Sequence, residues 1–167
     1  ARRADQILAR AREFVRQPCR DRSQGKLLSV ALQGLPPQLL EMGFPAPFMA
    51  LPLLVYAAVR NEEKPAFPLA VATTLLYLGV DILDDLADGD LPAHWKGRKE
   101  SEINLAAVTL ISSLPQLALA ELDASPETIA GLQRLLADGL LTMSAGQQRD
   151  LALAGTMRVT AAAEACP

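Results

Sequence analysis

The sequence has few aromatic residues, two cysteines and one histidine among its 167 residues. Cys19 and Cys166 lie near opposite ends and form no CxxC pair, so neither a disulfide framework nor a cysteine–histidine metal site is expected. β-Branched residues are also sparse, whereas alanine and leucine, both strong helix formers, dominate. This composition favours an all-α protein with one sizeable core.

The chain also lacks a strong net charge, which is −3 at neutral pH, so no nucleic-acid partner is expected. The charge is nevertheless uneven, because residues 1–26 contain eight Arg or Lys and three Asp or Glu. Such a segment could contact a membrane surface or an anionic ligand, but a solvated helix face is the favoured interpretation. Charged residues interrupt every apolar stretch at the N-terminus, which excludes a signal peptide there and predicts a cytoplasmic protein.

Long hydrophobic runs are absent as well. Three uncharged or nearly uncharged apolar stretches cover residues 42–59, 65–80 and 103–120. Each falls short of the roughly 20 residues that a membrane-spanning helix needs, and each contains Pro, Asn or Gln. Helices that are apolar on nearly all sides also occupy the centre of large helical bundles. We therefore predict buried core helices and no transmembrane segment.

We expect a single helical domain over residues 1–167, built from about seven helices. Gly89 is a natural helix terminator, whereas Ser125 followed by Pro126 is typical of a helix start. The two prolines at 36–37 and Pro115 should bend or break their helices. The expected helices cover residues 4–16, 26–42, 47–60, 67–88, 101–122, 126–154 and 157–166.

The segment DILDDLADGD, residues 81–90, places five aspartates directly after an uncharged stretch. Four of them follow the spacing i, i+3, i+4 and i+7, which puts them on one face of a helix: Asp81, Asp84, Asp85 and Asp88. Their mutual repulsion is unfavourable, and the negative end of the helix dipole adds to it. A divalent cation would offset this cost, and carboxylate oxygens suit Mg²⁺.

The same aspartates allow two alternatives to a magnesium site. A calcium EF-hand loop beginning at Asp84 would need ligands at positions 3 and 12, where the chain has Leu86 and Trp95, so it is rejected. A solvated acidic helix end would need no metal. The run ends a long apolar helix, however, so its carboxylates should lie in or beside an interior cavity, which favours the metal.

The stretch LYLGVDILDDLADGD resembles the first aspartate-rich motif, DDxxD, of the isoprenyl diphosphate synthases (polyprenyl synthetases), matched by Asp84, Asp85 and Asp88. About sixty residues later, SAGQQRDL resembles that family's GQxxDL segment through Gly146, Gln147, Asp150 and Leu151. The Trp-containing loop between the motifs looks more like the subgroup that modifies bacterial signalling peptides. The resemblance covers about residues 45–155.

This resemblance implies an all-α bundle of the class I isoprenoid (terpenoid) synthase type, truncated to its N-terminal half. Asp84, Asp85 and Asp88 would be the catalytic metal ligands, holding Mg²⁺ against the diphosphate of an allylic prenyl diphosphate. Ionisation to an allylic carbocation would be followed by condensation or cyclisation. Asp81, Gln147 and Asp150 would bind the substrate.

Two family features are missing. The GKxxRP segment that binds isopentenyl diphosphate should fall near residues 40–50, where the chain reads EMGFPAPFMALP, which favours another acceptor or cyclisation. No second aspartate-rich motif follows GQQRDL. The alternative hypothesis is therefore a non-catalytic subunit that binds a diphosphate or a partner bundle. Half a bundle would expose apolar sides near residues 51–59 and 103–119, so a homo- or hetero-oligomer is expected.

Overall fold

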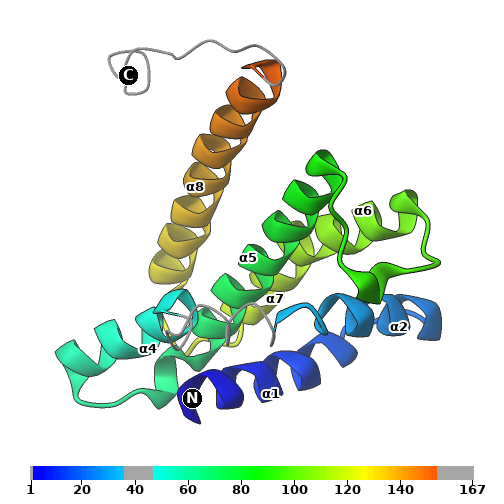
Figure 1. Cartoon of the computed structure of the whole chain (residues 1–167). Helices are drawn as coiled ribbons and strands as arrows, with labels where there is room; N and C mark the ends of the chain where they lie inside the picture. Colours follow the sequence, from blue (N-terminus) through cyan, green and yellow to red (C-terminus); the bar gives the residue numbers. More distant parts are fainter. Residues whose placement is uncertain (1, 36–46, 154–167) are drawn as a thin grey trace. The chain divides into compact units, whose positions relative to one another are not determined.

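A computed structural model describes residues 2–35 and 47–153 (Figure 1). Within these ranges every regular element is a helix, which confirms the all-α prediction. The chain divides into two compact units, Ala1–Ser125 and Pro126–Pro167, and each is described by itself. The predicted helix 157–166 lies outside the described residues. The predicted helix 26–42 was too long, because the observed helix ends at Ala31 and a turn follows at residues 32–34; residues 36–42 lie outside the described residues. The single domain stays a prediction.

The first two helices are α1 (Arg2–Arg16) and α2 (Arg22–Ala31). In α1 the apolar side chains Ile7, Ala11 and Phe14 recur at helical spacing and are buried. The predicted start of α2 at residue 26 was wrong, because Asp21 caps the helix earlier: its carboxylate accepts a hydrogen bond from the Gln24 backbone N–H at 2.9 Å.

Helix α4 (Pro47–Arg60) is followed by the short 3₁₀ turn η1 (Lys64–Ala66). Met49 and Leu53 of α4 are fully buried, whereas its other side is open to solvent. The large apolar side chains exposed on α4 include Leu51, Leu54, Val55 and Val59. The sequence-based prediction of an exposed apolar side near residues 51–59 is therefore confirmed.

Helix α5 (Phe67–Asp88) is the central element of the first unit and packs against α1, α4, α6 and α7. Ala70, Leu75, Leu78 and Ile82 bury its inner side. The helix ends as predicted at Gly89, whose φ of 72° is left-handed and therefore favours glycine. The aspartate cluster thus lies at the C-terminal end of the core helix.

The segment after α5 runs through the turn η2 (Ala93–Trp95), α6 (Glu100–Val108), the π-helical turn η3 (Thr109–Ser113) and α7 (Leu114–Leu119). The predicted single helix 101–122 is thus interrupted, just upstream of Pro115. Because proline has no N–H, it cannot donate to the carbonyl of Ile111, and the helix widens there. Leu105, Val108 and Leu117 are exposed, as predicted for residues 103–119.

Two segments, residues 64–88 and 100–119, are long and apolar enough to cross a membrane by length and composition. About half of each apolar window, 50% and 44% respectively, is buried within the structure. Core helices of soluble proteins meet the same criterion. The absence of a transmembrane segment stays a prediction.

The second unit is described only for α8 (Pro126–Leu153). The helix begins at Pro126, as the Ser-Pro-Glu sequence predicts. None of its described residues is buried, and Leu135 and Leu141 are among the exposed apolar side chains.

Candidate functional site

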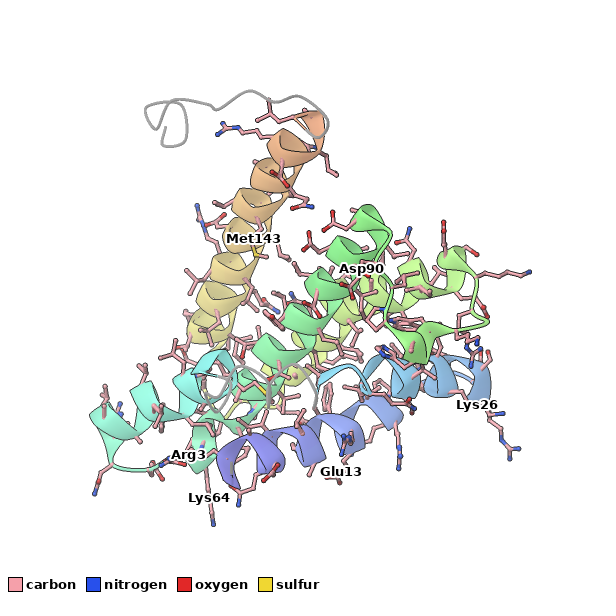
Figure 2. The ribbon with its side chains drawn as sticks, viewed as in Figure 1. Arg3, Glu13, Lys26, Lys64, Asp90 and Met143 are labelled. Atoms are coloured by element: carbon pink, nitrogen blue, oxygen red, sulfur yellow. The ribbon has the colours of Figure 1, made fainter. Side chains whose placement is uncertain are left out.

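The candidate site is the acidic cluster at the end of α5, defined as Asp81, Asp84, Asp85, Asp88 and Asp90. Asp81 and Asp85 are half-buried, and the other three are exposed. The helix is anchored in the core beside these carboxylates, where Leu78 and Ile82 are each 2% exposed. Figure 2 shows Asp90 at the end of α5. The sequence therefore places four carboxylates on one face of the helix, and Asp81 and Asp85 border the side that is buried in the core.

The turn after α5 adds the fifth carboxylate to the cluster. The backbone N–H groups of Gly89 and Asp90 both donate to the carbonyl oxygen of Asp85, the latter at 3.0 Å. These two bonds satisfy a carbonyl that the helix end would otherwise leave without an intrahelical partner. They also fold the chain back, so that Asp90 stays close enough to Asp85 to affect its titration.

Asp85 is the electrostatic centre of the acidic cluster. Partial burial, and then the charges of Asp81, Asp90, Asp84 and Asp88, raise the pKa of its carboxyl from 3.8 to about 6. Among the described residues, neither Asp85 nor Asp88 takes part in an ion pair. The protein therefore gathers negative charge at this helix end without an arginine or lysine paired to these two carboxylates.

Tyr77 also belongs to this site, although it was not among the site residues predicted from the sequence. It lies one helical turn before Asp81, and its ring is 38% exposed. Burial, followed by the charges of Asp81 and Asp85, raises the pKa of its phenol. The hydroxyl therefore stays protonated and able to donate beside the carboxylates. Its position four residues before Asp81 is the sequence signal that could have identified it.

The donor set suits a hard divalent cation, because all the ligands are carboxylate oxygens. Among residues 2–35 and 47–153, no three Asp, Glu, His or Cys side chains are arranged to hold a metal ion by themselves. Mg²⁺ usually uses one or two carboxylates and completes its shell with water and substrate phosphates. The residues present therefore fit Mg²⁺ shared with a phosphate ligand better than a closed protein site.

Gln147 and Asp150, the other predicted substrate-binding residues, lie near the end of α8. Gln147 is half-buried and Asp150 is exposed. Both belong to the second unit, so their place opposite the acidic cluster stays a prediction.

No family model, curated protein or solved structure matches the chain. The resemblance to isoprenyl diphosphate synthases therefore depends on the two sequence motifs and stays a hypothesis.

Proposed function

We propose that the chain is a Mg²⁺-dependent prenyltransferase or terpene-synthase-like protein of the class I isoprenoid synthase type, acting on an allylic prenyl diphosphate. The observation that carries this proposal is the acidic cluster itself. A core helix ends in a group of carboxylates, and partial burial together with their charges raises the pKa of Asp85 to about 6. This arrangement costs stability, and binding of Mg²⁺ with a diphosphate would offset that cost.

The aspartates would act as ligands and orienting groups. Asp84, Asp85 and Asp88 are the proposed metal ligands, and Asp85 with its pKa of about 6 is mostly ionised at neutral pH. Bound Mg²⁺ would neutralise charge on the departing diphosphate. Asp81 and the protonated Tyr77 hydroxyl lie one and two turns earlier on α5, where they could orient the substrate.

The acceptor is proposed to be something other than isopentenyl diphosphate, or a double bond of the same chain in a cyclisation. This proposal depends on the sequence EMGFPAPFMALP, which has no lysine or arginine where the family binds that substrate. The oligomer and the cytoplasmic location remain part of the same proposal.

A second candidate is a non-catalytic subunit that binds a diphosphate or a partner bundle. Two observations favour it. The described carboxylates form no three-ligand metal arrangement, and α4 exposes apolar side chains that include Leu51 at 55% and Val59 at 75%. Such a surface is typical of a face covered by another protein.

A turnover assay distinguishes the two candidates. Release of inorganic diphosphate from farnesyl diphosphate is measured with and without Mg²⁺, in the wild type and in Asp84→Asn/Asp85→Asn. The double variant should lose at least about 100-fold in rate, the usual cost of removing a group that stabilises developing charge. Glu62→Gln/Glu100→Gln removes the same charge from exposed positions outside the cluster and should retain activity.

Mg²⁺-dependent turnover that survives in Asp84→Asn/Asp85→Asn would disprove the assigned ligands. A wild type that binds farnesyl diphosphate with Mg²⁺ but never releases diphosphate would favour the non-catalytic subunit.

A further inference from the structure

A second charged feature lies at the junction of α1 and α2, in the same unit as the acidic cluster but away from it. It is an open groove of about 680 Å³, called here the cationic groove. Its charged lining residues are Arg16, Asp21, Arg22, Lys26 and Arg98. Figure 2 shows Lys26 at the outer end of α2, clearly apart from Asp90 at the end of α5.

The cations of this groove are poorly neutralised by the protein. Among the described residues, Arg16, Arg22 and Lys26 form no ion pair, and the contact of Arg98 with Glu102 is long, at 3.9 Å. Four cations therefore face one carboxylate, in a chain whose net charge is negative.

The single carboxylate of the groove, Asp21, is already engaged. It accepts hydrogen bonds from Ser23 Oγ at 2.6 Å and from the Gln24 backbone N–H at 2.9 Å. These bonds lower the pKa of Asp21 and hold its charge at the N-terminus of α2. The carboxylate therefore acts as a helix cap and, among the described residues, forms no ion pair with the four cations.

The groove is built on rigid elements. Arg22, Lys26 and Ser29 recur at i, i+4 and i+7, so one side of α2 presents polar groups. The opposite side of α2 is anchored in the core, for example by Leu28, which is 1% exposed. Arg22 and Lys26 therefore project from a fixed helix face.

Arg98 reaches the groove from a distant part of the sequence. Its backbone N–H donates to the carbonyl of Trp95 at 2.9 Å, and Trp95 is 2% exposed, so this turn is anchored in the core. The turn η2 packs against α2, and His94 lies so close to Gly34 that an added Cβ would come within 3.0 Å of its ring. Arg98 is thereby held near the cations of α2.

We propose that the cationic groove binds a phosphate-bearing anion, either a small organic phosphate or the headgroup of an anionic phospholipid. Arginine donates several N–H groups in a plane that matches phosphate oxygens, and lysine adds a point charge. The volume lies within the roughly 300–1,000 Å³ of small-molecule sites. The groove needs no metal for this, whereas the acidic cluster repels anions unless a cation is bound.

The test is calorimetric titration of the full chain with inorganic pyrophosphate in EDTA. The wild type should show saturable binding that weakens with added NaCl. Arg22→Gln/Lys26→Gln should bind at least about tenfold more weakly, because one charge-assisted hydrogen bond is worth that factor or more. The matched control Arg12→Gln/Arg60→Gln removes two exposed cations outside the groove and should bind as the wild type does.

A vesicle arm identifies the source of the phosphate. Cosedimentation with phosphatidylglycerol–phosphatidylcholine vesicles, compared with phosphatidylcholine alone, should depend on Arg22 and Lys26 if the ligand is a lipid headgroup. Saturable pyrophosphate binding without vesicle binding identifies a soluble phosphate. If neither pyrophosphate nor vesicle binding depends on the groove cations, the proposal is overturned.

Circular dichroism checks that Arg22→Gln/Lys26→Gln is folded, and the single variant Lys26→Gln, at an exposed position, serves if the double variant is not. EDTA keeps this test separate from the proposed prenyl diphosphate site. If the protein turns over substrate with Mg²⁺ but does not bind pyrophosphate in EDTA, only the proposal for the cationic groove is overturned. If it binds pyrophosphate in EDTA but shows no Mg²⁺-dependent turnover, only the proposed function is overturned.

Discussion

Gly79 of α5 lies directly against Ile111 of η3, since a Cβ built on Gly79 would come within 2.6 Å of Ile111 Cγ1. The carbonyl oxygen of Ala107 would be 2.9 Å away. The close approach of these helices two residues before Asp81 therefore requires glycine. It fixes the end of α5 that carries the acidic cluster.

Gly79→Ala should destabilise the protein by about 1–2 kcal/mol. Overpacking costs roughly 1–3 kcal/mol, and the better helix propensity of alanine returns up to about 1 kcal/mol. Urea unfolding measures the change. Gly25→Ala is the control, because its Cβ would meet only Cys19, at an ordinary 3.7 Å, and it should be neutral or stabilising. Equal stability of both variants would show that the Gly79 contact is not tight.

Asp85 should make stability fall as pH rises from about 4 to about 6. Its pKa is 3.8 ordinarily and about 6 in the folded protein, so the folded state holds a proton that the unfolded state has lost. Solvent screening reduces the effect to about 1 kcal/mol. Asp85→Asn should therefore be more stable than the wild type above pH 6, by about that amount. The prediction is contradicted if the unfolding free energies of the wild type and of Asp85→Asn change in the same way between pH 4 and pH 7. The control is Asp123→Asn, which replaces an exposed aspartate outside the cluster.

Trp95 is the single tryptophan of the chain and is 2% exposed, so it reports on the loop after the acidic cluster. Its emission should be blue-shifted relative to the unfolded chain and resistant to iodide quenching. Its indole N–H is buried without a hydrogen-bond partner within the described structure. Trp95→Phe removes that unsatisfied donor and should fold. Strong iodide quenching in the native protein would contradict the burial of Trp95.

The exposed apolar side of α4 should drive association. Val55 and Val59 are 56% and 75% exposed, and an apolar surface of this kind is usually covered by another protein. Sedimentation should show a species larger than a monomer, which Val55→Glu/Val59→Glu should shift toward the monomer. A wild type that sediments as a single monomeric species would contradict this prediction.

Much of the fold could be predicted from local signals. Gly89 ends α5 and Pro126 begins α8 as expected, because each residue acts through its own backbone geometry. The start of α2 was missed because Asp21, rather than Lys26, sets it. Pro115 correctly predicted an interruption of the helix, but its presence does not predict that the interruption is the π-helical turn η3.

The candidate site was predictable only where it is contiguous in sequence. The spacing of the aspartates on α5 follows from helix geometry, but the raised pKa of Asp85 depends on burial and on the turn that brings Asp90 back. The excess of cations in residues 1–26 is visible in the sequence, but the groove itself could not be predicted, because Arg98 joins Arg16 and Lys26 only through tertiary packing. Whether Gln147 lies near the aspartates stays a prediction.

The central claim is that the aspartates of α5 form a metal–diphosphate site, and thermal unfolding with Mg²⁺ and farnesyl diphosphate tests it most directly. Ligand at about 100 times its dissociation constant should stabilise the folded wild type by about 2.7 kcal/mol, a shift of several degrees, only when both ligands are present. Asp84→Asn/Asp85→Asn should not shift, and Glu62→Gln/Glu100→Gln should shift as the wild type does. The same shift in Asp84→Asn/Asp85→Asn as in the wild type, or no shift in any of the three proteins, would contradict the claim.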